Sequence, residues 1–149
     1  MINYKGRQPA WLMAFLYGKT MNKNKKTQNK KTLTHSDLSQ FTGTITYYRN
    51  ASGLFFTDGV YYLAEHGRAY WLIDIISISQ SDSKIDNDPM LQKIQFWKLK
   101  VNADNSAQLV CERDRDDVVL SIDIPYTNFP LKEITLYCQE EVLMLPSEY

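Results

Sequence analysis

The strongest constraint on the fold is an alternation of hydrophobic and polar residues, with a period of two, between residues 94 and 124. Trp97 and Leu99 fall on one side of the first stretch, whereas Lys98 and Lys100 fall on the other. Successive side chains of a β-strand point to opposite faces, so this pattern predicts a strand with one buried face. The alternation recurs at 107–111 and at 118–124, after turn-rich segments. The sequence therefore predicts a three-stranded antiparallel meander.

Two helices are predicted upstream of the meander. The first starts at Thr57 or Asp58, whose side chains can cap a helix N-terminus, and ends at Gly67, which suits a C-terminal cap. The second follows at once, because apolar residues recur at helical spacing over 69–78. The polar segment 79–89 ends it and has the composition of the least ordered stretch.

Shorter elements complete the predicted fold. A turn of helix is expected at 37–41, a hairpin from 44–48 and 54–56, and two short strands at 134–138 and 142–145. The expected fold class is α+β: an antiparallel sheet, made of the meander plus the N-terminal hairpin, with two helices packed on one face.

The charges divide the chain into two parts. The net charge is zero, with 17 basic and 17 acidic residues. Residues 1–36 carry eight of the bases and no acid, so 37–149 hold nine bases and all 17 acids. We therefore expect a basic N-terminal leader over 1–36, disordered by composition, and a single α+β domain over 37–149.

The leader has several interpretations. Its hydrophobic run at 10–17 resembles a short signal-peptide core or an interfacial anchor, but no small-residue cleavage site follows and no run is long enough for a membrane span. Met21 is an alternative translation start. The lysine-rich arm either solubilises the protein or makes weak nucleic-acid contact through Lys23, Lys25, Lys26, Lys30 and Lys31.

Cys111 and Cys138 are the only cysteines. Both lie on predicted strands, which favours buried thiols in a reducing cytoplasm over a disulfide framework or a zinc site. No cofactor-binding fingerprint or metal motif occurs, so the sequence predicts neither a cofactor nor a metal.

The candidates for catalysis are few. His66 is the only histidine in 37–149, and it lies beside Glu65 near the end of the first helix. Asp74 is an acid within an apolar helical segment, where burial would perturb its pKa. These three residues would form a catalytic group only if their side chains converge in one pocket.

Aromatic residues suggest a different kind of site. Neighbouring aromatic pairs place one ring inward and one outward, and the outward rings would form an exposed surface suited to binding. The candidates for this surface are Tyr48, Tyr62, Tyr70 and Trp97.

Five strings carry a resemblance to a known family: FTDGVYYLAE (56–65), AYWLID (69–74), QFWKLKVN (95–102), YTNFPL (126–131) and LPSEY (145–149). Together they resemble a small bacterial domain-of-unknown-function family found on chromosomes, plasmids and phage-like elements. The resemblance runs from about residue 38 to residue 149. It implies a bacterial cytoplasmic protein and assigns no catalytic residue.

The function expected first is a non-enzymatic, cytoplasmic module that binds another protein. The alternatives are a small hydrolase-like enzyme using Asp74, Glu65 and His66, and nucleic-acid contact through the lysine-rich arm. A further hypothesis is that the acidic domain mimics DNA, which requires its acids to gather on one face.

Overall fold

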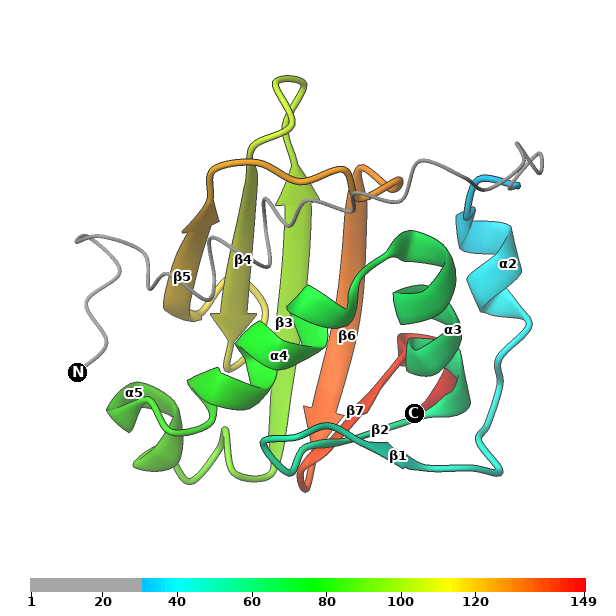
Figure 1. The fold of residues 1–149 in the computed structure, drawn as a ribbon. Helices are drawn as coiled ribbons and strands as arrows, with labels where there is room; N and C mark the ends of the chain where they lie inside the picture. The colour runs from blue at the N-terminus through cyan, green and yellow to red at the C-terminus, as the bar shows by residue number, and fades with distance from the viewer. Residues whose placement is uncertain (1–30) are drawn as a thin grey trace.

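A computed structural model of the chain describes residues 31–149, and the structural statements below concern that range. The domain contains one seven-stranded sheet with helices packed against it (Figure 1). Its elements are α2 (His35–Ser39), β1 (Tyr48–Arg49), β2 (Phe55–Phe56), α3 (Asp58–Gly67), α4 (Tyr70–Ser79), α5 (Ser83–Asp86), β3 (Ile94–Val101), β4 (Ala107–Glu112), β5 (Val118–Ile124), β6 (Glu133–Gln139), β7 (Val142–Met144) and the 3-10 turn η1 (Pro146–Glu148).

The predicted meander is confirmed as β3, β4 and β5. Antiparallel pairing places Trp97 opposite Cys111, and Cys111 opposite Leu120, so hydrophobic side chains of all three strands share one face. The other side of β3 pairs with β6, where Leu136 lies opposite Trp97. The strand β3 is therefore central, and Trp97 and Leu136 are both about 1% exposed.

The remaining strands extend the sheet in the order β1-β2-β7-β6-β3-β4-β5. The strand β7 is antiparallel to β6, whereas β2 joins β7 in parallel. The predicted N-terminal hairpin is present as β1 and β2, with Tyr48 opposite Phe56, but each strand has only two residues. The preceding segment pairs elsewhere, because the backbone N–H groups of Ile45 and Thr46 donate to the Asp58 carboxylate.

Both predicted helices are present. Thr57 caps α3, since its hydroxyl accepts from the Val60 N–H at 3.4 Å. The C-terminal cap differs from the prediction: Arg68, with φ of 51°, takes the left-handed conformation. Gly67 lies inside the last turn, where an added Cβ would lie 3.1 Å from Phe129 and 3.2 Å from Leu33. Close packing explains this glycine.

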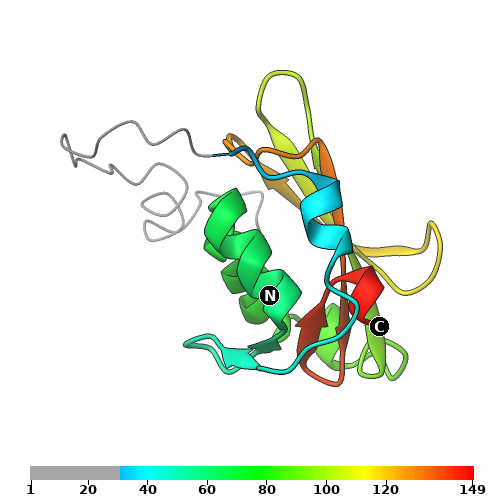
Figure 2. The same ribbon diagram turned by 90° about the vertical axis from the view of Figure 1, so that its right-hand side faces the viewer.

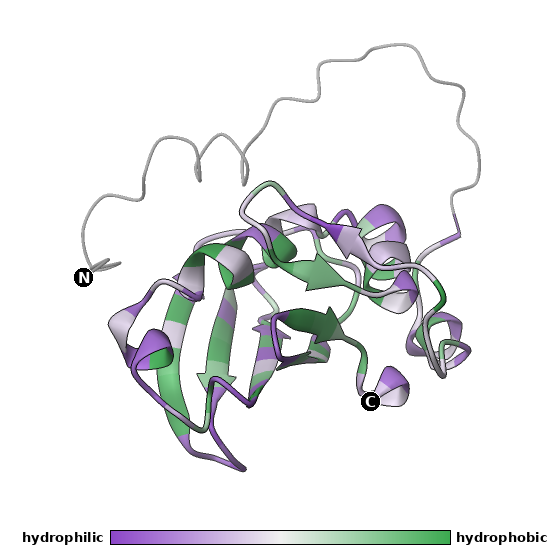
Figure 3. Ribbon diagram, turned by 90° about the horizontal axis from the view of Figure 1, so that it is seen from below, coloured by the Kyte–Doolittle hydropathy of each residue, from purple (hydrophilic) through white to green (hydrophobic). Residues whose placement is uncertain are grey.

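The sheet has two different faces. The helices α3 and α4 lie on the same side of it (Figures 1 and 2), as the sequence predicted. In Figure 3 hydrophobic colouring is concentrated on several strands of the sheet, and hydrophilic colouring on many of the connecting turns. The face away from the helices carries exposed polar side chains on its central and outer strands: Lys100, Gln108, Ser121, Asp123 and Glu133.

The polar segment between α4 and β3 is more structured than its composition suggested. It contains α5, capped by the Asp82 side chain, which accepts from the Lys84 N–H at 2.9 Å. Ile85 and Leu91 anchor the segment in the core, because both are at most 1% exposed.

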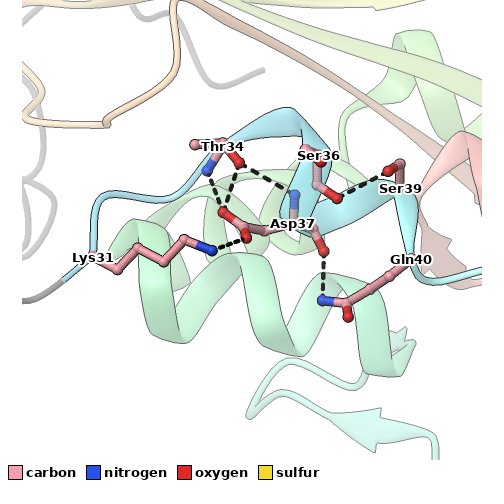
Figure 4. A network of polar contacts seen from close by, with 6 residues as sticks. All are labelled: Lys31, Thr34, Ser36, Asp37, Ser39 and Gln40. Atoms are coloured by element: carbon pink, nitrogen blue, oxygen red, sulfur yellow. Dashed lines mark hydrogen bonds and ion pairs between the residues drawn. The ribbon is translucent and has the colours of Figure 1, made fainter.

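The folded region begins before residue 37. Leu33 is 3% exposed and belongs to the hydrophobic core. Thr34 caps α2. In return, the Asp37 carboxylate accepts a hydrogen bond from the Thr34 N–H at 2.9 Å, which completes a capping box (Figure 4). The Lys31 ammonium lies 2.6 Å from the Asp37 carboxylate. This ion pair and the bonds to Thr34 lower the pKa of Asp37 to about 2.

Across residues 31–149, no helix combines the length and the apolar character that crossing a membrane requires.

Candidate functional site: an aromatic surface on α3

Aromatic side chains surround α3: Tyr61 and Tyr70 are exposed, whereas Phe41, Tyr48 and Tyr62 are half-buried and pack against the core. Val60, Leu63 and Ala64 bury one side of the helix against the core. Helical periodicity therefore turns Tyr61 outward, whereas Tyr62 is half-buried at the edge of the core. We call the following set the aromatic surface: Phe41, Tyr48, Tyr61, Tyr62, His66 and Tyr70.

Stacking holds these rings in place. Tyr48 stacks on Tyr61 with ring centroids 4.3 Å apart and an interplanar angle of 8°. Tyr62 lies between Phe41, at 5.2 Å, and His66, at 3.9 Å. Packed pairs of this kind contribute about 0.5–1.5 kcal/mol beyond their buried area. The rings are thus fixed before any partner arrives, which lowers the entropy cost of binding.

Tyr70, at the start of α4, adds a polar contact to the surface. Its hydroxyl donates to the Glu65 carboxylate on α3. Burial and this hydrogen bond raise the pKa of Tyr70, so the hydroxyl stays protonated. Tyr61 and Tyr70 are each 37% exposed, which leaves a large part of both rings in solvent.

A second carboxylate lies at the other end of the surface. Asp58, in the first turn of α3, accepts from the N–H groups of Ile45 at 2.9 Å and Thr46 at 3.2 Å. These bonds lower the pKa of Asp58 and keep it charged. They also hold the segment before β1 against α3, where Ile45 is 96% exposed and Tyr47 is 57% exposed.

Of the four aromatic residues predicted for an exposed surface, Tyr70 is exposed, Tyr48 and Tyr62 are half-buried against the core, and Trp97 is buried. Trp97 is 1% exposed, and its indole N–H donates to Gln95 Oε1 at 2.8 Å within the core. The Gln95 amide exchanges hydrogen bonds with Gln80 at 2.7 and 2.9 Å. Assigning Trp97 to the surface was wrong, because it shares the buried face of β3 with Leu99.

The prediction omitted Tyr61. Tyr61 points outward because it lies opposite the residues that α3 buries. Its helical spacing from Val60, Leu63 and Ala64 was the signal that could have identified it.

The three candidate catalytic residues do not form a group. Among residues 31–149, no hydrogen bond or ion pair joins any two of Glu65, His66 and Asp74. His66 stacks on Tyr62 and has Nδ1 3.0 Å from the Tyr62 carbonyl oxygen. Asp74 accepts from Asn50 Nδ2 at 3.4 Å, and burial raises its pKa.

Both cysteines are free and buried. Burial raises the pKa of Cys111 and of Cys138 to about 12, so neither thiol is an activated nucleophile. Within the described part of the chain, no group of three or more His, Cys, Asp or Glu side chains could hold a metal ion.

The acids do not gather on one face, as the hypothesis of DNA mimicry requires. Asp104 lies in the turn after β3, and Asp117 lies in the turn after β4. Because β3 and β4 are antiparallel, these turns lie at opposite ends of the sheet. Asp58 lies on α3, away from both turns. The geometry therefore does not support a DNA-like acidic surface.

A family model matches residues 32–149. The chain belongs to DUF6876, a family of unknown function. The match begins one residue before the buried Leu33 and covers all of the described residues except Lys31. No curated protein and no solved structure matches the chain.

Two of the family-like strings meet in the DUF6876 domain. The Glu148 carboxylate, in the final LPSEY string, accepts from the Thr57 hydroxyl at 2.6 Å and from the Gly59 N–H at 3.0 Å. It also accepts from the Leu145 N–H at 2.9 Å. A negative charge at a helix N-terminus is favourable, so this contact ties the C-terminal turn to α3.

The lysine-rich arm of the DUF6876 chain lies largely outside the described residues. Lys31 is the one predicted arm residue within the described range, and it pairs with Asp37. The other four lysines, Lys23, Lys25, Lys26 and Lys30, lie outside the described residues. Nucleic-acid contact through them stays a prediction.

Proposed function

We propose that this domain is a non-enzymatic protein-interaction module of the bacterial cytoplasm and that the aromatic surface on α3 is its binding site. One observation carries the proposal. Nine large hydrophobic side chains are exposed in the described chain, and four of them surround α3: Ile45, Tyr47, Tyr61 and Tyr70. Exposed apolar side chains that cluster in this way mark interaction sites more often than scattered ones do.

The chemistry of the surface defines the kind of partner. Tyrosine supplies large contact area at low entropy cost and is enriched among residues that dominate binding energy. The carboxylates of Asp58 and Glu65 lie at the ring edges and add negative charge. A protein segment with apolar residues and one or two Lys or Arg side chains would satisfy both features, since these cations also bind ring faces.

The assignment to a non-enzymatic, cytoplasmic role has separate support. The titratable candidates Glu65, His66 and Asp74 contact different groups rather than one another. The two cysteines are buried free thiols, which is the usual state in a reducing compartment.

Site-specific crosslinking in bacterial cells tests the proposal. A photoreactive residue at position 61 should capture a protein, whereas one at Met90, which is 53% exposed and lies outside both the aromatic surface and β5, should not. With that protein purified, Tyr61→Ala should weaken binding by about 2 kcal/mol, or roughly thirtyfold, as measured by calorimetry. Equal capture at both positions, or unchanged affinity of the variant, would refute the site.

A further inference from the structure

Among residues 31–149, the outer edge of β5 pairs with no other strand, although α5 contacts this strand. The strand β5 is last in the sheet order and spans seven residues, whereas the opposite edge strand, β1, has two. Its sequence VVLSIDI contains no proline, glycine or basic residue. Natural proteins protect such edges with short strands, prolines or lysines, and a long edge without them is a template for another strand.

We propose that β5 pairs antiparallel with β5 of a second copy of the chain, around a two-fold axis at Ser121. In this register Leu120 lies opposite Ile122 of the second copy, and Val118 lies opposite Ile124. All seven residues then have a partner in the second copy, and the side chains of each pair lie on the same face of the joined sheet. Moving the axis to Leu120 or to Ile122 keeps the faces matched but shortens the pairing.

Charge favours the same arrangement. Asp123 is the only charged residue of β5, and the register places it opposite Val119. An axis at Leu120 would place Asp123 opposite Asp117, and like charges directly opposite each other destabilise a strand pair. The antiparallel orientation also keeps the two acidic turns at 114–117 at opposite ends of the interface.

The proposed pairing also gives apolar neighbours to two hydrophobic residues that are exposed in the single chain. Val118 is 49% exposed, and Tyr126, just beyond the other end of β5, is 43% exposed. Antiparallel pairing brings Val118 of one copy close to the end of β5 that precedes Tyr126 in the other. These two side chains thereby gain apolar neighbours at both ends of the interface.

The dimer should be weak. Pairing along one strand edge buries a small area, and association carries a large entropy cost. We therefore expect a monomer–dimer equilibrium whose position depends on protein concentration, with a dissociation constant in the micromolar range.

Analytical ultracentrifugation of the full chain, over about 1 to 500 µM, tests the pairing across the concentrations at which a micromolar dimer dissociates. Ser121 is exposed on the polar face, so Ser121→Lys leaves the core intact but places two ammonium groups opposite each other at the axis. The dissociation constant of the dimer should rise by about tenfold or more in Ser121→Lys, and by a similar factor in Ser121→Glu. An equimolar mixture of the two variants should restore the dimer, because Lys then faces Glu.

The matched control is Gln108→Lys, which adds the same charge to the same face one strand inward. It should dimerise as the wild type does. A wild type that is monomeric throughout, a Ser121→Lys variant that still dimerises, or a mixture that stays monomeric each overturns the proposed pairing. Loss of the dimer in Gln108→Lys overturns it as well, because the effect would not be specific to the edge.

Discussion

Asp74 is a carboxylate placed among apolar neighbours of α4. Ile73 and Ile75 on either side of it are buried, and the Asp74 side chain has one hydrogen bond, from Asn50. Burial raises its pKa, which means that the folded state binds the proton more tightly than the unfolded chain does. The charged form of Asp74 therefore works against folding at neutral pH.

Replacing Asp74 with Asn should consequently stabilise the domain at pH 7. The amide keeps the shape and can accept the Asn50 hydrogen bond, but it carries no charge to desolvate. The difference from the wild type should shrink as the pH falls through the raised pKa and vanish near the unfolded value of about 4. Urea unfolding at pH 7 and near pH 4 measures this difference in the free energy of unfolding. If Asp74→Asn is less stable than the wild type at pH 7, the charge of Asp74 does not work against folding.

The candidate site was predictable from sequence only where a residue follows the periodicity of its own element. Tyr70 could be placed on the surface because α4 buries the positions that follow it, whereas Tyr62 is half-buried against the core. The alternation of inward and outward side chains along β3 argued against Trp97, because it places Trp97 on the buried face with Leu99. The contact between Tyr48 and Tyr61 joins two elements that are distant in sequence, and no local pattern encodes such a contact.

Among the elements, the junction between the start of α3 and the C-terminal turn depends most on single side chains. A Cβ at position 59 would lie 2.5 Å from Leu145 Cδ1 and 2.7 Å from Glu148 Oε2. A Cβ here would displace the ends of the Leu145 and Glu148 side chains, so Gly59 permits the close approach of the turn to the helix. Glu148 then accepts hydrogen bonds from the hydroxyl of Thr57 and the N–H of Gly59.

Gly59→Ala should lower the free energy of unfolding by about 1–3 kcal/mol, because the added methyl group forces the C-terminal turn away from α3. Glu148→Gln should lower it by about 1.5–3 kcal/mol, because a charged acceptor is lost. Gly43→Ala is the matched control, since nothing lies within 4 Å of its Cβ. Denaturant unfolding measures all three, and a Gly59→Ala variant as stable as Gly43→Ala would contradict the close approach.

Elements with a strong local pattern were predicted well, and their order in the sheet was not. The three meander strands, α3 and α4 all follow periodicity that is visible in the sequence. The insertion of β6 next to β3 and the parallel pairing of β2 with β7 depend on long-range packing. Helix ends also depend on contacts, which is why Arg68 rather than Gly67 takes the left-handed position.

For the whole molecule, the folded region includes residues that precede the first acid, Asp37. The sequence predicted a domain that starts at residue 37, where the first acid occurs. Leu33 is nevertheless part of the core, and Lys31 pairs with the α2 capping box. Electrostatic composition located the boundary only approximately, because one buried leucine within a basic segment leaves little compositional trace.

A chain that begins at residue 31 should therefore be more stable than one that begins at residue 37. The shorter chain loses the buried Leu33 and the Thr34 cap, and a buried leucine alone accounts for about 2–5 kcal/mol. Leu33→Ala in the longer chain should reproduce most of the loss. Equal unfolding midpoints for the two chains would show that the core begins at α2.

The parallel contact between β2 and β7 has a consequence for synthesis. Phe55 and Val142 are partners in the sheet but are far apart in the chain. At about 5–20 residues per second, the ribosome adds the residues between them in on the order of ten seconds. Throughout that interval β2 has no β7 with which to pair, and the hydrophobic side of α3 has only part of its cover. The nascent chain therefore exposes its first strands longest, and a chaperone that binds emerging apolar segments would find them there.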